Sequence, residues 1–242
     1  MTGTPRIEVH PDPATLATAV AGELLSRLAD AQAAGGVPQV ALTGGTIAEE
    51  IHREIARLAP GTEVDWSQVG FWWGDERFVA PDSPDRNAAG ARTAFLDAVG
   101  ADSARVHEMP STADATDVDT GAAAYADELR THGGGEFDIV MLGVGPDGHV
   151  ASLFPGFPQL DDDGIAVGVT GSPKPPPERI SLTFAALNRA RSVWFLVSGE
   201  GKSGAVAAAL GDDADHHDVP AAGVTGHEET IWFLDRGAAS QL

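Results

Sequence analysis

The sequence contains no cysteine, and Lys174 and Lys202 are its only lysines. Without cysteine there is no disulfide, no thiolate metal ligand and no thiol nucleophile. The first 30 residues lack the basic segment and long apolar stretch of a secretory signal. No apolar run approaches the roughly 20 residues that are needed to cross a bilayer. We therefore expect a soluble, cytoplasmic protein.

Basic residues are scarce as a class: 15 Lys and Arg stand against 36 Asp and Glu, a formal net charge of −21. Nucleic acids and anionic membranes are bound through Lys and Arg contacts to phosphate, so neither partner is expected. We interpret the acidic surface mainly as a solubility feature. If the ligand is itself an anion, the few basic residues must be concentrated where it binds.

Short continuous apolar runs alternate with helical patterns along the chain. Leucine and valine four residues apart predict a helix over 14–34, and a second helix begins at Thr46 and stops at Pro60. Such alternation is typical of a doubly wound α/β fold, a mainly parallel sheet with helices on both faces. No linker or repeat divides the chain, so residues 1–242 are expected to form a single domain. The runs expected to be strands are 37–42, 69–73, 137–142, 192–197 and 230–234.

Four of these runs lead directly into a polar segment that contains glycine. In open α/β sheets the ligand site lies beyond the carboxyl ends of the strands. We therefore expect the four segments to form one site. They are residues 43–46, 74–77, 143–149 and 198–202.

Residues 143–148 match the G-x-G-x-x-G pattern of dinucleotide-binding proteins. That site needs a long helix after the glycines and an acid at the end of the next strand. Here Pro146 interrupts the loop and Pro155 ends any helix early, while the acids at 161–163 precede a candidate strand. A dinucleotide site is therefore not predicted.

Residues 201–203 are similar to the end of a nucleotide-binding P-loop, but Leu196 stands where that motif requires glycine. A single lysine beside backbone amides at a helix start can still hold one phosphate group. Gly44, Gly45 and Thr46 supply free N–H groups at another helix start. We predict that Lys202 binds a phosphate group, and that the segment 44–46 binds a phosphate or a sugar hydroxyl.

His149 stands in a tight glycine turn, two residues after Asp147. A carboxylate near an imidazole fixes its tautomer and orientation, as a general base requires. No G-x-S-x-G motif occurs, so a serine nucleophile is not indicated. We interpret Ser152 as a hydrogen-bonding residue at a helix start.

Three further clusters are interpreted as structural. The His216-His217 pair and the acids at 161–163 do not match the ligand spacing of a zinc or EF-hand site, so we expect solvated loops and no metal. Residues 173–177 contain a PxxP element, but a strand is expected to start at Arg179 directly afterwards. A structured connection is therefore expected there.

The motifs also occur in a characteristic order between about Val40 and Leu234. They are the segments 74–79, 143–155 and 179–183, with Asn87 and the Gly201-Lys202 pair. Together they resemble the family of glucosamine-6-phosphate isomerases and 6-phosphogluconolactonases, and the run from Gly145 to Pro155 is very specific for the lactonases. The resemblance implies a doubly wound α/β fold, a lactonase of the oxidative pentose phosphate pathway, and no cofactor.

Deaminases of the same family continue after the histidine with Phe-Asn-Glu-Pro, whose glutamate takes part in catalysis. Here the continuation is Ser152-Leu-Phe-Pro155, and no acid follows until Asp161. In the Gly-Gly loop the family often has Ser-Thr-Pro, whereas this chain has Thr46-Ile-Ala48. A deaminase or isomerase and a non-catalytic sugar-phosphate sensor remain as alternatives, although no DNA-binding domain of a regulator is visible.

The expected reaction is hydrolysis of 6-phospho-D-glucono-1,5-lactone by an activated water. Neutral His149 takes a proton from the water that attacks the lactone carbonyl and returns it to the leaving ring oxygen. Free imidazole groups titrate near pH 6.5, which suits this role in the cytosol. Asp147 or Asp75 orients the ring or the water, and loop N–H groups or a basic side chain stabilise the charge on the carbonyl oxygen.

The expected ligand is a small sugar phosphate, and the sequence specifies no oligomeric state. Seven residues are predicted to bind it, three of them cations for its phosphate group. They are Gly44, Gly45, Thr46, Arg77, Asn87, Arg179 and Lys202.

Overall fold

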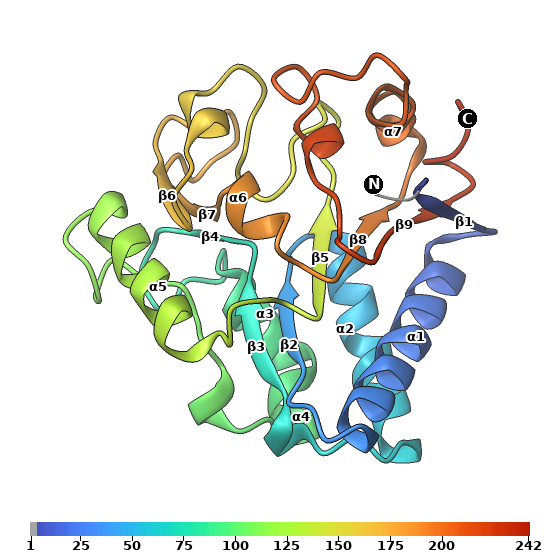
Figure 1. The fold of residues 1–242 in the computed structure, drawn as a ribbon, viewed down its shortest axis with the longest axis vertical. Coiled ribbons are helices and arrows are strands. Elements are labelled where there is room, and N and C mark those ends of the chain that lie inside the picture. The colour runs from blue at the N-terminus through green and yellow to red at the C-terminus, as the bar shows by residue number, and fades with distance from the viewer. Residues whose placement is uncertain (1–3) are drawn as a thin grey trace.

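A computed structural model describes residues 4–242, whose strands form two sheets. The larger sheet has the order β1-β9-β8-β5-β2-β3, and all neighbouring strands are parallel (Figure 1). Its strands are β1 (Arg6–His10), β2 (Gln39–Leu42), β3 (Gly70–Trp73), β5 (Ile139–Gly143), β8 (Ser192–Val197) and β9 (Glu229–Asp235).

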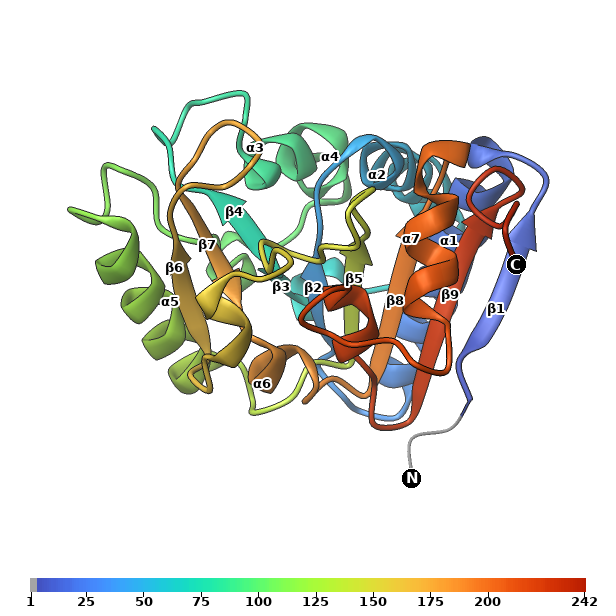
Figure 2. The same cartoon turned by 90° about the horizontal axis from the view of Figure 1, so that it is seen from above.

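The larger sheet is doubly wound. From β2 the chain moves to β3 at one edge, whereas from β5 it moves through β8 to β9 in the opposite direction. Figure 2 shows α2 and α4 on one side of this sheet and α6 on the other. This arrangement confirms the predicted fold. The helices are α1 (Pro13–Ala33), α2 (Thr46–Leu58), α3 (Asn87–Ala91), α4 (Asp97–Val99), α5 (Val118–His132), α6 (Phe184–Leu187) and α7 (Ser203–Ala209).

Burial explains why the predicted strands are apolar throughout. Every residue of β3 and of β8 is buried, because helices or loops cover both faces of the sheet at these positions. Helix α1 buries a single stripe that includes Leu16, Val20, Leu24 and Leu28, and it packs against α2. Within residues 4–242, no helix is both long enough and apolar enough to cross a membrane.

A second, antiparallel sheet was not predicted. It has the order β4-β7-β6, with β4 (Asp75–Arg77), β6 (Ala166–Val169) and β7 (Arg179–Leu182), and α5 packs against β6 and β7 at one end of the molecule (Figure 1). The polar segment after β3 is therefore a strand and not a loop. Its pairing places Arg77 directly opposite Arg179 and Asp75 opposite Ser181.

Strand β1 was also missed by the sequence analysis. It pairs only with β9 at the edge of the larger sheet, and Ile7 and Val9 are largely exposed. An exposed edge strand of five residues that includes Arg6 and His10 lacks the continuous apolar run from which the other strands were predicted.

His52 in α2 is a buried titratable group, 3 % exposed and with its ring 4.9 Å from that of Phe95. Burial, and next the positive charge of Arg53, lower the pKa of His52 to about 4. A free histidine titrates near pH 6.5, so between about pH 6.5 and pH 4 the unfolded chain binds a proton that the folded chain does not. Stability is therefore lost as the pH falls through this window.

Replacement of His52 with leucine should remove this pH dependence. Relative to the His52→Leu variant, we expect the wild-type free energy of unfolding to fall by about 2 kcal/mol between about pH 7.5 and about pH 5. Urea unfolding of both proteins at the two pH values measures the difference. An equal loss of stability in both proteins would show that His52 is not held neutral in the folded chain.

Candidate active site

A cavity of about 230 Å³ lies at the carboxyl ends of the strands, where β2 and β5 lie side by side. This is the point at which the sheet changes winding direction, the usual position of a ligand site in such folds. All four predicted polar segments contribute to it. The predicted site residues that line the cavity are Gly44, Gly45, Asp75, Arg77, Asn87, His149, Arg179 and Lys202.

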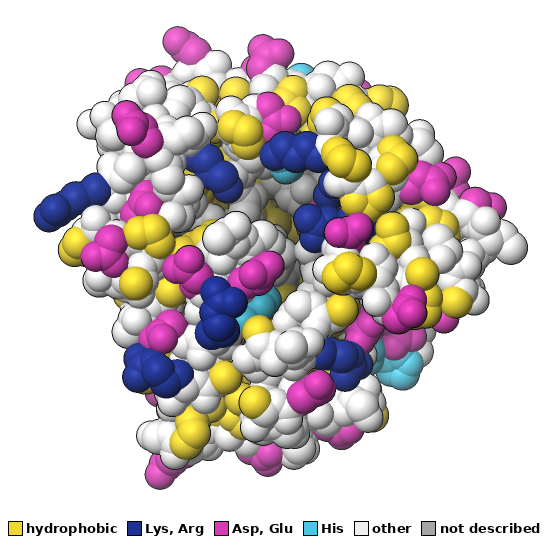
Figure 3. Space-filling view, turned by 180° about the vertical axis from the view of Figure 1, so that it is seen from behind, with side chains coloured by type: hydrophobic (Ala, Val, Ile, Leu, Met, Phe, Trp, Pro, Cys, Tyr) yellow, Lys and Arg dark blue, Asp and Glu magenta, His cyan; other side chains and the backbone are white. Residues whose placement is uncertain are grey.

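Cations are concentrated at this cavity although the chain is strongly acidic. Arg77, Arg179 and both lysines of the chain line it, whereas Asp75 is the only acidic lining residue among those that the structure describes. Figure 3 shows lysine and arginine side chains bordering a hollow on one face of the molecule, with acidic side chains scattered over the rest of that face. The cavity is therefore suited to an anion.

His149 is held by Asp147, although Asp147 does not itself line the cavity. The Nδ1 atom of His149 lies 2.5 Å from Oδ1 of Asp147, and the ring packs at 4.7 Å from that of Phe154. Burial alone would raise the pKa of Asp147, but the hydrogen bond and the charge of His149 outweigh it and lower this pKa to about 2. An ionised carboxylate only accepts hydrogen bonds, so Nδ1 carries the hydrogen and Nε2 is left as the basic atom.

The turn that presents His149 depends on two glycines. Gly148 has a φ of 82°, and a Cβ atom there would collide with Val219. Gly145 lies directly beneath the His149 ring, and its backbone N–H donates to the His149 carbonyl at 2.9 Å. The two glycines therefore allow a tight turn in which the His149 ring packs against the backbone of Gly145.

Asp75 makes its closest contact with a serine and not with His149. The Oγ of Ser152 donates to Oδ2 of Asp75 at 2.6 Å, and both side chains are buried. Ser152 lies in the loop that follows the His149 turn, so its interpretation as a helix-start residue is wrong: no helix forms between Gly145 and Phe157. Of the two predicted orienting acids, Asp147 is the one that contacts the imidazole.

Arg77 and Asn87 are positioned through the buried side chain of Glu76. Its carboxylate accepts the backbone N–H groups of Arg77, Asn87 and Ala88 at 2.7–2.9 Å, which fixes the start of α3 against β4. The guanidinium of Arg77 then donates to Oδ1 of Asn87, whose Nδ2 donates to the Asp75 carbonyl at 2.9 Å. Glu76 therefore organises this side of the cavity without lining it.

Arg179 and Lys202 are partly desolvated cations. Burial lowers the pKa of Arg179, partly offset by the attraction of Asp75. Burial, and next the repulsion of Lys174, lower the pKa of Lys202. The buried Nε of Arg179 has no hydrogen-bond partner among the described residues. Both residues line the cavity, so an anion bound there would interact with their positive charges.

Thr46 lies outside this cavity. It lines an adjoining cavity of about 260 Å³, which shares Gly44, Gly45, Arg77 and Asn87 with the first. Helix α2 begins at Thr46 with Gly45 as its N-cap, and no side chain caps it. The prediction that this loop offers free N–H groups at a helix start fits this geometry, whereas Thr46 itself lines only the second cavity of the two.

Three residues that line the cavity were not found by sequence reasoning: Ala151, Lys174 and Pro175. Lys174 belongs to the proline-rich connection between β6 and β7, which was interpreted as structural only. Ala151 has a φ of 48°, a left-handed conformation that is uncommon for a residue other than glycine. The scarcity of lysine in an acidic chain was the one signal that could have identified Lys174.

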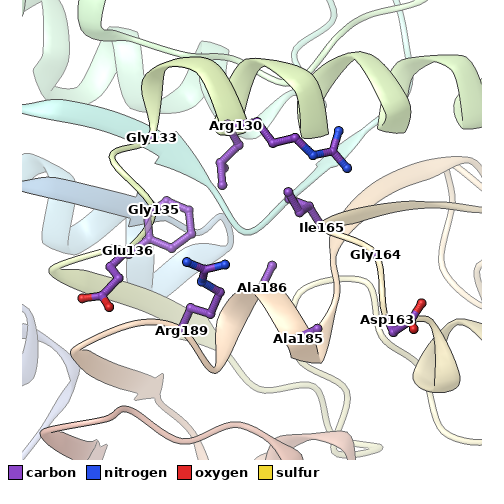
Figure 4. Close-up of a pocket in the computed structure, with 12 residues that line it drawn as sticks. Arg130, Gly133, Gly135, Glu136, Asp163, Gly164, Ile165, Ala185, Ala186 and Arg189 are labelled. Atoms are coloured by element: carbon purple, nitrogen blue, oxygen red, sulfur yellow. The ribbon is translucent and has the colours of Figure 1, made fainter.

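A larger pocket, of about 320 Å³, lies between α5, the following glycine loop and α6 (Figure 4). Its surface is mainly apolar, with side chains such as Leu129, Phe137 and Ile165, and no histidine lines it. Arg189 is directed into it from the end of α6 (Figure 4). It lacks a general base paired with a carboxylate, so the smaller cavity is the better candidate for catalysis.

The His216-His217 pair joins two of the predicted solvated loops. His217 lies 3.2 Å from Asp215 through Nδ1 and 2.9 Å from Asp161 through Nε2, and these contacts raise its pKa. Asp215, His216 and His217 could together face a cation. Both nitrogens of His217 are directed at carboxylates, however, so a metal ion would have to displace one of these contacts.

Comparison with known proteins identifies the family. The sequence profile described as glucosamine-6-phosphate isomerases/6-phosphogluconolactonase matches residues 11–232. The chain is 45 % identical to 6-phosphogluconolactonase of Streptomyces coelicolor over 252 residues, which covers 100 % of this chain and 96 % of the relative. It is 42 % identical to the enzyme of that name from Mycobacterium tuberculosis, with 98 % of each chain covered.

The fold is shared with solved structures of the same name. The crystal structure of 6-phosphogluconolactonase from Thermotoga maritima superposes with a TM-score of 0.84 at 26 % identity, over 96 % of this chain and 99 % of that chain. The sequence comparisons agree with this superposition. The profile matches most of the chain, and the relatives are similar over its full length. The chain belongs to the family of glucosamine-6-phosphate isomerases and 6-phosphogluconolactonases.

Proposed function

We propose that the protein hydrolyses 6-phospho-D-glucono-1,5-lactone to 6-phospho-D-gluconate, the lactonase step of the oxidative pentose phosphate pathway. One observation carries this proposal: a carboxylate-oriented imidazole opens into a cavity whose other charged groups are mainly cations. The imidazole can activate water for attack on an ester, and the cations can hold a phosphorylated substrate. The names of the relatives support the same substrate.

His149 is the proposed general base. With its hydrogen on Nδ1 and bonded to Asp147, Nε2 takes a proton from water while the water oxygen attacks C1 of the lactone. The carbonyl becomes a tetrahedral oxyanion. When it collapses, the C1–O5 bond breaks and the imidazolium returns the proton to the ring oxygen, which leaves as a hydroxyl. The carboxylate of Asp147 stabilises the transient imidazolium.

The remaining charged residues are proposed to bind the substrate. Arg179, Lys202 and Arg77 hold the phosphate, and the backbone N–H groups of Gly44 and Gly45 donate to phosphate or sugar oxygens. Asn87 fixes the Arg77 guanidinium. Asp75, which accepts a hydrogen bond from Ser152, attracts Arg179 and reduces the net positive charge of the cavity.

A deaminase is the main rival, because the family includes glucosamine-6-phosphate isomerases. A deaminase of this family uses a glutamate shortly after the histidine, and this chain has Ser152-Leu-Phe-Pro155 there. The Ser152 side chain is committed to Asp75, and the segment carries no acid that could replace the glutamate. The lactonase is therefore the better-supported activity.

Product analysis distinguishes the two activities. The purified protein should accelerate hydrolysis of freshly generated 6-phosphogluconolactone, both as prepared and with EDTA, and should release no ammonia from glucosamine 6-phosphate. Ammonia release would favour the deaminase. Loss of lactonase activity in EDTA, with recovery on adding zinc, would contradict a mechanism in which His149 activates water without a metal.

A further inference from the structure

Lys174 has no assigned role, yet it lines the same cavity as the other lysine of the chain. Its side chain is exposed, and no acidic group forms an ion pair with it among residues 4–242. Lys202, the other lysine of the cavity, likewise forms no ion pair among the described residues. The absence of a partner leaves the ammonium group available for a ligand.

Proline fixes the backbone that carries Lys174. Lys174 is the only residue other than proline between 173 and 177, so φ is restricted on both sides of it. Less conformational entropy is therefore lost when this loop is held in one shape. The loop connects β6 to β7, and β7 begins with the cavity residue Arg179.

Hydrogen bonds tie the same loop to the cavity. The carbonyl oxygen of Lys174 accepts from Oγ of Ser172 at 3.0 Å and from the Arg179 guanidinium at 3.1 Å. Ser172 N–H also donates to the Pro177 carbonyl at 3.0 Å, which closes the loop on itself. The Lys174 backbone is therefore held against the guanidinium of Arg179, which also lines the cavity.

The two lysines are close enough to repel each other. The charge of Lys174 contributes to the lowered pKa of Lys202, after the larger effect of burial. Two like charges at one cavity repel each other, and an anion that interacts with both reduces this repulsion. A phosphate dianion is the group in a sugar phosphate that would interact with both ammonium groups and the Arg179 guanidinium.

We propose that Lys174, which lies on the proline-rich loop 172–178, binds the substrate phosphate together with Lys202. In this role it is a substrate-binding and specificity-determining residue. This inference rests on the proposed function for the identity of the ligand. It assigns the loop a role in selecting phosphorylated over unphosphorylated sugars. The proline-restricted backbone holds Lys174 at the cavity before the ligand binds, so little further ordering of the loop is needed on binding.

Isothermal titration with 6-phosphogluconate and with inorganic phosphate tests this assignment without turnover. Lys174→Met keeps the apolar stem but removes the charge, and it should weaken 6-phosphogluconate binding about ten- to a hundredfold, the range of a charge-assisted contact. Lys174→Arg should retain most of the affinity. Combined with Lys202→Met, the loss should be smaller than the sum of the two single losses, because both side chains bind one group.

Arg189→Met is the matched control. It removes one positive charge from an exposed side chain that faces the larger pocket and not the cavity, so it changes the net charge equally. Wild-type affinity in Lys174→Met, an equal loss in Arg189→Met, or an equal loss in Lys174→Arg would each overturn the assignment. If the wild type binds 6-phosphogluconate through Lys174 but does not hydrolyse the lactone, the proposed function fails while the binding assignment stands.

Discussion

Replacement of His149 with asparagine is expected to lower kcat about 10²–10⁴-fold and to change KM much less. Asparagine is close in size and can still accept a hydrogen from water, but it cannot take up a proton. The substitution therefore raises the energy of the transition state, in which water transfers its proton to the base, and has little effect on substrate binding. Steady-state kinetics, corrected for spontaneous opening of the lactone, measure the change. A near-normal kcat would reduce His149 to a structural role.

The pH profile gives a second measurement on the same variant. The wild-type kcat should fall at acidic pH, because the imidazole must be unprotonated to act as a base, and the His149→Asn variant should lose this limb. His227→Asn is a suitable control, since His227 is exposed and lies outside the cavity. An unchanged acidic limb in His149→Asn would assign the titration to another group.

Replacement of Lys202 with alanine is expected to raise KM for the phosphorylated lactone about ten- to a hundredfold. Local cations must overcome the background of a chain with net charge −21 to bind a phosphate dianion. Salt screens charges beyond about 8 Å at physiological ionic strength, so direct contacts outweigh the distant acids. Lys202 is partly buried, which further strengthens its contact with an anion.

Unphosphorylated gluconolactone separates phosphate recognition from chemistry. Its hydrolysis, expected to be poor in the wild type, should be almost unchanged in Lys202→Ala because the missing contact is to the phosphate. Arg189→Ala, which removes a cation outside the cavity, should leave KM for both lactones near the wild-type values. Equal damage to both lactones in Lys202→Ala would place Lys202 at the carbonyl end of the site, or in the fold alone.

The larger sheet was predictable because its central strands are buried on both faces and therefore apolar along their whole length. The same pattern locates the carboxyl end of each strand, which is why Gly44, His149 and Lys202 could be expected in one place. The structure brings all three to one cavity. The carboxyl ends of the predicted strands therefore located most of the site residues.

Features that depend on tertiary pairing were not predictable in this way. The strand that contains Asp75 and Arg77 is polar, and it forms only because β7 lies beside it. The Ser152–Asp75 hydrogen bond joins residues 77 positions apart, and no local pattern encodes it. Lys174 lies in a proline-rich loop that resembles a simple connection in the sequence. Only the three-dimensional structure shows that this residue lines the cavity.

The central claim is that this cavity hydrolyses the phosphorylated lactone. The most direct test follows freshly generated 6-phosphogluconolactone by NMR at neutral pH, with and without the protein. The account predicts that the 1,5-lactone signals are replaced by those of 6-phosphogluconate much faster than in buffer alone. Decay at the buffer rate, in the presence of folded protein that still binds 6-phosphogluconate, would contradict it.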